Sequence, residues 1–330
     1  YYFMDRLNSR YKQQVEEISF SYTRKVLGGK IGIVFYDMTT IYFESSQPDE
    51  LRETGFSKDG KHQHPQIFLG LLVGKDGYPI GYDIFEGSTY EGHTLVPVLK
   101  KFEERFKLNK PIVVADAGLL STKNIEALKA NGYTFILGAR IKNESNLVKN
   151  CIHELNLHDG EIAKINKPDN TTLFISYSTK RAKKDLSNRE RGLKRLEKSL
   201  KAGRLTKSNI NNRGYNKYLN MQGEVKIDID YEKFGNDSKW DGLKGYITNT
   251  TLSGKEVIEN YNNLWKIEKA FRISKTDLKI RPIYHRLHDR IEAHICISFV
   301  VAKNEPVCIQ IDPLKMSVLI GAPFKYKFSA

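Results

Sequence analysis

Residues 31–37 read IGIVFYD, a nearly continuous apolar run that ends in a carboxylate, and a second run, IYFE, follows three residues later. Apolar runs of this length, rich in β-branched and aromatic residues, are typical of buried strands. We therefore predict a strand that ends at Asp37 and turns into another strand.

The segments that follow predict the rest of a sheet. The runs QIFLGLLV (66–73) and YPIGYDIF (78–85) flank a Lys-Asp-Gly turn, which favours a hairpin. Apolar residues then recur at helical spacing over 95–102, and PIVVAD (111–116) is a short apolar run that again ends in an aspartate. A further helix precedes the predicted strand TFIL (134–137). This order predicts an α/β fold with a mixed sheet and helices packed on it.

The composition changes between residues 141 and 240. LFISYS (173–178) and VKIDID (225–230) are typical of strands, and the basic stretch 181–207 between them places its leucines on one helical face. We predict an amphipathic helix with a cationic outer side. A solvated helix that only keeps an insertion soluble explains this stretch equally well.

The strongest helix signal begins at Ser253, which forms a capping-box pattern with Glu256. Apolar residues then recur at helical spacing through 257–275 and place Glu268 within an apolar stripe. A second helix is predicted over 287–301.

The chain is strongly basic. Its 330 residues include 53 Lys and Arg against 39 Asp and Glu, a net charge of +14, which favours a polyanionic partner such as nucleic acid. Three cysteines without paired spacing favour a reducing compartment, so we expect a cytoplasmic protein. No run approaches the ~18 apolar residues of a transmembrane helix, which excludes a membrane protein.

Three carboxylates stand out because they lie in or after apolar runs of separate elements: Asp37, Asp116 and Glu268. A buried ionised carboxylate is costly unless it is paired, hydrogen-bonded or bound to metal. Oxygen-only ligands suit Mg²⁺ or Mn²⁺, and two such ions can promote phosphoryl displacement. Ordinary roles remain open: Asp37 as a turn residue, Asp116 as a loop cap, and Glu268 as an ion-pair partner of Arg272.

These stretches together resemble the DDE transposases of bacterial insertion sequences, in the branch with a helical Y-(2)-R-(3)-E-(6)-K signature. Tyr261, Glu268 and Lys275 stand at that spacing, and Leu264 occupies the arginine position. The similarity extends over roughly residues 31–300. Its three motif regions are YDMTTIYFESSQPDELRETGFSKDGK (36–61), VVADAGLLSTKNIEAL (113–128) and LWKIEKAFRISKTDLKIRPIYH (264–285).

The resemblance implies an RNase H-like core interrupted by a largely β insertion subdomain with a basic helix. In such a core the first aspartate lies on the first strand, the second follows the fourth strand, and the glutamate lies on a later helix. We expect five parts: an N-terminal remnant or linker (1–30), the first part of the core (31–140), the insertion subdomain (141–240), the second part of the core (241–301) and an irregular tail (302–330).

The resemblance also implies an activity. Asp37, Asp116 and Glu268 would hold two Mg²⁺ ions, for which Mn²⁺ can substitute, to cleave DNA at the element's ends and transfer the freed strand to target DNA. The expected partner is double-stranded DNA, bound by a homodimer at the nucleoid.

The family analogy further suggests DNA contacts, each with an ordinary alternative. The candidates are Tyr261, Lys275 and Arg272 for phosphates, Trp265 for an unpaired base, and Lys58 and Lys61 in a glycine-bounded loop. Core packing is the alternative for Tyr261 and the favoured role for Trp265. Lys275 is also consistent with a helix end that reaches solvent, and the loop lysines are equally consistent with a solvated turn. Lys266 and Arg272 are candidates to replace the missing arginine.

Two other functions compete with a transposase. One is a transposase-derived DNA-binding protein without catalysis. The other is a haloacid-dehalogenase-like phosphohydrolase, for which the strand ending DMTT offers an aspartate but has Thr39 where a second aspartate is wanted.

Overall fold

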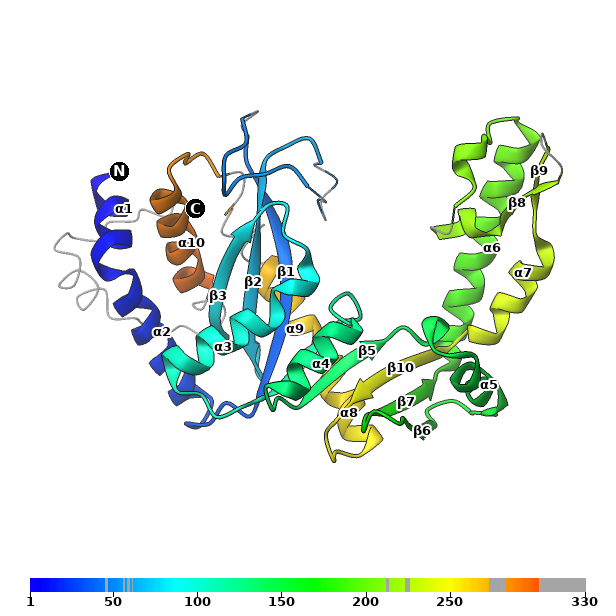
Figure 1. Ribbon diagram of the computed structural model, residues 1–330, viewed down its shortest axis with the longest axis horizontal. Coiled ribbons are helices and arrows are strands. Elements are labelled where there is room, and N and C mark those ends of the chain that lie inside the picture. The colour runs from blue at the N-terminus through cyan, green and yellow to red at the C-terminus, as the bar shows by residue number, and fades with distance from the viewer. Residues whose placement is uncertain are drawn as a thin grey trace, which may run out of the picture. The chain divides into compact units, whose positions relative to one another are not determined.

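The computed structural model describes residues 1–44, 47–55, 57, 60, 62–211, 214–222, 226–272, 280 and 283–302. These residues form two compact units (Figure 1). The first unit contains residues 1–138, 248–252 and the described residues from 256 onward, and the second unit contains residues 139–247 and 253–255.

The first unit is built on a mixed sheet with the strand order β3-β2-β1-β4-β5. Strands β1, β2 and β3 pair antiparallel, whereas β4 is parallel to β1 and β5 is parallel to β4. The predicted mixed α/β fold and the β2–β3 hairpin are therefore confirmed. The strands are β1 (Ile33–Tyr42), β2 (Gln66–Gly74), β3 (Pro79–Glu86), β4 (Ile112–Ala115) and β5 (Phe135–Ala139).

Strand β1 differs from the prediction of two strands with a turn after Asp37. It is one strand of ten residues, and its pairing with β2 continues without a break from Val34 to Tyr42. Thr39 and Thr40 are buried and β-branched, so they extend the strand where a turn was expected. Asp37 thus lies in the middle of β1.

Helices cover both faces of this sheet. In Figure 1, α3 lies in front of the strands and α9, which packs on β1 and β2, lies behind them. The predicted second helix near the C-terminal end of the core is confirmed as α10. The helices are α1 (Tyr2–Arg6), the π-helix η1 (Leu7–Tyr11), α2 (Lys12–Val26), η2 (Glu91–His93), α3 (Leu95–Phe106), α4 (Thr122–Ala130), α8 (Gly254–Asn262), α9 (Trp265–Arg272) and α10 (His288–Ala302).

The N-terminal segment is helical where we expected a remnant or linker. Its apolar face buries Leu7, Val15 and Phe20 at 2%, 4% and 5% exposure, and its helices pack on β3 and α10. The ring of Phe20 stacks on that of Phe106 of α3, with centroids 4.1 Å apart. Residues 1–26 are therefore an integral part of the first unit.

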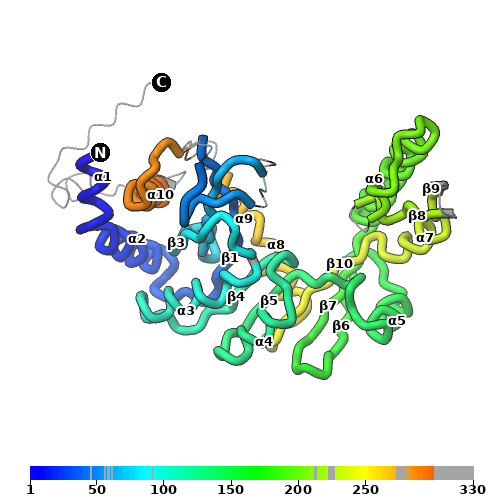
Figure 2. Tube along the Cα trace, turned by 45° about the horizontal axis from the view of Figure 1, so that its top comes forward, coloured from blue at the N-terminus to red at the C-terminus, as the bar shows by residue number. Residues whose placement is uncertain are grey.

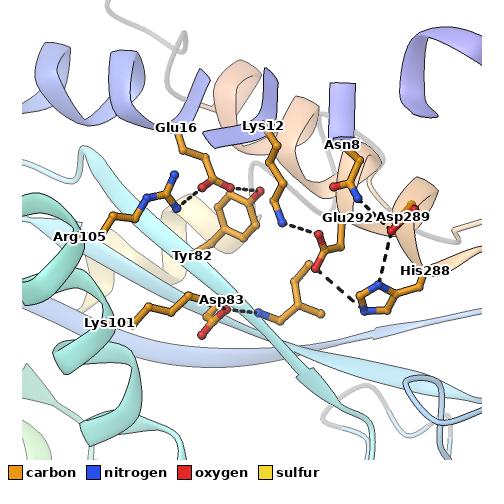
Figure 3. Close-up of polar contacts among 11 residues, drawn as sticks. Asn8, Lys12, Glu16, Tyr82, Asp83, Lys101, Arg105, His288, Asp289 and Glu292 are labelled. Atoms are coloured by element: carbon orange, nitrogen blue, oxygen red, sulfur yellow. Dashed lines mark hydrogen bonds and ion pairs between the residues drawn. The ribbon is translucent and has the colours of Figure 1, made fainter. Parts of the chain in front are cut away.

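Polar contacts hold α2 on the sheet (Figure 3). Glu16 accepts a hydrogen bond of 2.7 Å from the hydroxyl of Tyr82 on β3 and pairs with Arg105 of α3. Burial above all raises the pKa of Tyr82 well above its ordinary value, so its hydroxyl keeps the proton that it donates. Lys12 forms a 2.5 Å ion pair with Glu292 of α10. One helix thus links three neighbouring elements.

The second unit contains a sheet of order β10-β7-β6 and a separate hairpin, β8-β9. Its strands are β6 (Ile162–Asn166), β7 (Thr172–Tyr177), β8 (Leu219–Gln222), β9 (Lys226–Ile229) and β10 (Leu243–Thr248). Its helices are η3 (Ile141–Asn143), α5 (Asn146–Glu154), α6 (Thr179–Lys201), η4 (Lys207–Asn209), η5 (Gly214–Tyr218), α7 (Tyr231–Asn236) and η6 (Asp237–Trp240). This unit is richer in helix than the largely β insertion that we expected.

Helix α6 is the predicted basic helix and is the long rod of the second unit in Figure 2. Ser178 caps its first turn by accepting a hydrogen bond of 3.4 Å from the backbone of Arg181. Gly192 lies directly against the ring of Tyr215, and Leu196 is buried, so the inner face packs closely. Lys184, Arg195 and most other cations of α6 are exposed on the opposite side. No helix among the described residues is long and apolar enough to cross a membrane.

Replacement of Glu16 by alanine should destabilise the first unit. The buried hydroxyl of Tyr82 and the guanidinium of Arg105 would both lose a partner, so we expect the free energy of unfolding to fall by about 2 kcal/mol. Glu17 is the matched control, because it is exposed on the same helix and its recorded side-chain contact is to Gln13. Urea denaturation followed by circular dichroism measures both variants; equal stability of Glu16→Ala and Glu17→Ala would contradict the assignment.

Candidate active site

Strand pairing brings the two predicted aspartates together. The parallel ladder between β1 and β4 matches Tyr36 with Ala115. Asp37 is the next residue of β1, and Asp116 directly follows the end of β4. Neighbouring strands lie about 4.8 Å apart, so the backbones of the two aspartates are side by side. Asp37 lies on the first strand and Asp116 directly after the fourth, as the sequence motifs predict.

Local backbone amides orient both carboxylates. Oδ1 of Asp37 accepts a hydrogen bond of 2.7 Å from the backbone of Met38, and Oδ1 of Asp116 accepts one of 2.7 Å from Gly118 in the turn after β4. Asp37 is half-buried and Asp116 is exposed. Asp116 lies at the surface because the chain turns directly after β4.

The predicted glutamate helix is broken in two. Helix α8 begins directly after Ser253, as predicted, but ends at Asn262, and α9 begins at Trp265. The amide of Leu264 bonds to the carbonyl of Tyr261 at 3.0 Å, a tight turn that replaces the continuous helix. The adjacent asparagines 262 and 263 are poor helix formers and are the sequence signal that marks this break.

Glu268 lies on α9, but not in a buried stripe. The buried side chains of α9 are Ile267, Ala270 and Phe271, whereas Glu268 is exposed. The prediction of a buried Glu268 was wrong because the buried stripe is centred on Ile267. No ion pair joins Glu268 to Arg272, both of which the structure describes.

Tyr261 lies beside the second aspartate. A methyl group placed on Gly138 would collide with the hydroxyl of Tyr261 and would lie 3.1 Å from the backbone nitrogen of Ala117. Ala117 directly follows Asp116, so the Tyr261 side chain reaches the turn that carries this carboxylate. Only glycine at 138 leaves room for this approach.

Two candidate DNA contacts on α9 are open to solvent. Trp265 is 54% exposed, so the alternative that it packs in the core is wrong, and Arg272 is also exposed. Leu264, at the position of the family's arginine, is 9% exposed. Lys266 does not replace that arginine, because its ammonium donates to the carbonyl of Lys75 at 2.7 Å in the β2–β3 turn.

The other predicted contacts, Lys58, Lys61 and Lys275, lie outside the described residues, as does the tail from residue 303.

A three-carboxylate metal site is not assembled. Among the described residues, no three His, Cys, Asp or Glu side chains lie close enough to hold one ion. The structure thus brings Asp37 and Asp116 together but does not add Glu268 to them. Two adjacent carboxylates still suit Mg²⁺ or Mn²⁺, since such ions bind through one or two carboxylates together with water and substrate phosphate.

Comparisons with solved structures give distant resemblances. A piggyBac transposase in a synaptic complex with hairpin DNA is 9% identical, with a TM-score of 0.45, over 90% of this chain and 54% of that one. A Mos1 transposase paired-end complex with the left transposon end is 15% identical, with a TM-score of 0.23; the match covers 40% of this chain and 41% of that chain. The Mos1 catalytic domain with raltegravir and Mn is 14% identical, with a TM-score of 0.23; the match covers 40% of this chain and 58% of that chain.

The chain spans only about half the length of these matched structures. No curated protein matches the sequence. The family model described as "Transposase DDE domain" matches residues 28–302, which include both aspartates and Glu268. The chain therefore belongs to the transposase DDE domain family.

Proposed function

We propose that this chain is the catalytic part of a DNA transposase, which cleaves DNA at the ends of an insertion sequence and joins the freed strand to target DNA. The observation that carries this proposal is the register of β1 and β4, which sets Asp37 beside Asp116 in a chain of this family. Net charge of +14 supports double-stranded DNA as the partner. We further propose that two protomers act together on paired ends.

In this proposal Asp37 and Asp116 hold divalent metal, Mg²⁺ or Mn²⁺, and Glu268 completes the site. Two such ions stabilise the attacking and leaving oxygens of an in-line displacement at phosphorus. The backbone amides of Met38 and Gly118 hold the two aspartates in place. Glu268 is exposed, so its side chain is free of packing that would prevent it from turning toward the aspartates.

The remaining residues would position DNA. The hydroxyl of Tyr261 lies next to the Asp116 turn, where it can donate to a phosphate near the cleaved bond. Trp265, one turn before Glu268, offers an exposed aromatic face on which an unpaired base can stack. Arg272 extends the positive charge along the same helix.

A DNA-binding protein without catalysis is the second candidate. The observation that favours it is the lack of a three-carboxylate cluster within the described part of the chain. Magnesium-dependent nicking of a duplex that carries the element's end separates the two functions.

Replacement of Glu268 by glutamine should abolish cleavage, with a rate loss of at least about 100-fold, and leave DNA binding intact, because one charged ligand is lost while the shape is kept. The matched control is Glu259→Gln on α8, an exposed glutamate outside the motif. Nicking of an end-bearing plasmid with Mg²⁺ gives the rate. Cleavage by Glu268→Gln at the wild-type rate would refute the catalytic assignment.

The metal assignment has a readout that does not depend on activity. Asp116→Asn should weaken Mn²⁺ binding by about tenfold or more, since it removes one of two adjacent carboxylates. Loss of a residue that only hydrogen-bonds a metal ligand already weakens metal binding by about tenfold. Electron paramagnetic resonance of free Mn²⁺ measures the affinity. Asp76→Asn, in the exposed β2–β3 turn, loses the same charge and should bind Mn²⁺ like the wild type; equal affinities for the two variants would contradict the site.

Trp265→Ala should weaken binding to DNA ends with unpaired bases by about tenfold, the usual contribution of one stacked base, and should change binding to blunt duplex little. Trp265→Phe retains an aromatic face and should recover most of the affinity. Leu147→Ala, a 74% exposed apolar residue of the second unit, controls for loss of surface area. Fluorescence anisotropy with labelled DNA ends measures the DNA affinity of the three variants. An unchanged affinity of Trp265→Ala would rule out stacking.

A further inference from the structure

The second unit contains a cavity of about 480 Å³ next to α6, η5, η6 and β10. This volume lies in the range of small-ligand pockets, roughly 300–1,000 Å³. Six cationic side chains line it: Arg140, Lys142, Arg181, Arg189, Lys217 and Lys244. Its acids are three aspartates, so cations are in excess.

Two of the six cations share one carboxylate. Asp237 pairs with Lys142 at 2.9 Å and with Lys217, and it accepts a hydrogen bond of 2.6 Å from the Tyr218 hydroxyl. Burial opposes ionisation of Asp237, but the hydrogen bonds from Lys217, Tyr218 and Lys142 outweigh it and hold its pKa well below the usual range. The charge of Asp237 is therefore shared between two lysines and leaves a net positive charge.

A third cation is built into the wall. Arg189 pairs with Asp241 and donates to the carbonyl of Phe234 at 3.1 Å, with only 9% of its side chain exposed. Its Nε is buried and has no hydrogen-bond partner among the described residues. A buried donor without a partner is costly, so this guanidinium is suited to a further acceptor.

The other three cations, Arg140, Arg181 and Lys244, line the same cavity. The pKa of Lys244 is lowered, first by burial and then by the positive charge of Arg181. Arg181 has only a loose ion pair with Asp185, at 3.5 Å, and the structure records no side-chain partner for Arg140 within the described part of the chain. Like charges that line one cavity are stabilised when an anion binds between them.

Aromatic side chains complete the walls. Tyr215 and Trp240, which are half-buried, and the buried Tyr218 line the same cavity. Guanidinium and ammonium groups recognise phosphate, whereas aromatic faces accept a base or sugar of any identity. The combination of these groups in one cavity matches a nucleotide.

We propose that this cavity is a second DNA contact, which takes one nucleotide of bound DNA and holds its phosphate between Arg140, Arg181 and Lys244. The inference rests on the proposed function, because it makes the second unit a part of the DNA-binding surface. It assigns a role to residues that no sequence motif marks, since Arg140 and Lys244 are about a hundred residues apart.

Tryptophan fluorescence tests the cavity directly. The chain has two tryptophans, so in a Trp265→Phe variant all tryptophan fluorescence comes from Trp240, which lies in the cavity wall. Titration with a short oligothymidylate should change the Trp240 emission until the change saturates. Thymidine 5′-monophosphate should give the same change with a lower affinity. Arg140→Gln with Arg181→Gln should raise the oligonucleotide dissociation constant about tenfold or more, since two charge-assisted contacts are lost.

The matched control removes two cations elsewhere on the same unit. Lys194→Gln with Lys198→Gln changes the exposed outer side of α6, outside the cavity, and should shift the dissociation constant by less than about threefold. Circular dichroism checks that both double variants fold.

Three outcomes would overturn the proposal. They are no response of Trp240 to the oligonucleotide, equal losses in the two double variants, and a response to inorganic phosphate or the mononucleotide without one to the oligonucleotide. Failure of the Glu268 cleavage test, with the Trp240 response retained, would refute transposase catalysis and leave the cavity as a DNA contact.

Discussion

The parallel pairing of β1 with β4 is the constraint on which the candidate site depends. Asp37 and Asp116 are far apart in the chain, and only this register makes them neighbours. The register is fixed because β1 is buried and also pairs over nine residues with β2, so a shift by one residue would turn apolar side chains out of the core. The aspartates are thus held by the sheet itself, and short hydrogen bonds to Met38 and Gly118 complete their orientation.

Helices α8 and α9 carry the other candidate residues. The break between them lets Tyr261 reach the Asp116 turn while α9 packs on β1 and β2 through Ile267, Ala270 and Phe271. The side chains at 265 and 268 then face solvent. In the proposed function they would meet an unpaired base and a metal ion. A single straight helix would have fixed the angle between Tyr261 and Glu268, whereas two short helices allow each to follow its own packing.

Much of the net positive charge lies on one helix of the second unit. Helix α6 carries ten Lys or Arg residues and three acids, which accounts for half of the net charge of +14. Its inner face packs through Leu196 and Gly192, and its outer face presents cations to solvent. Further cations surround the cavity of the second unit, where Asp237 and Asp241 neutralise only part of them. This arrangement gives the second unit, like the first, surfaces suited to phosphate.

Local patterns in the sequence predicted most of the strands, the hairpin, the basic helix and the two aspartates that follow or lie in apolar runs, because period and turn residues are local properties. Strands β6 and β8 were not predicted. It misjudged features that depend on contacts between distant residues. Thr39 and Thr40 extend β1 because β2 pairs with them, and the N-terminal helices fold onto β3 and α10 through Glu16 and its partners. The exposure of Glu268 and the cavity shared by Arg140 and Lys244 could not be predicted in this way, since both depend on residues that the fold brings together after long separations in the chain.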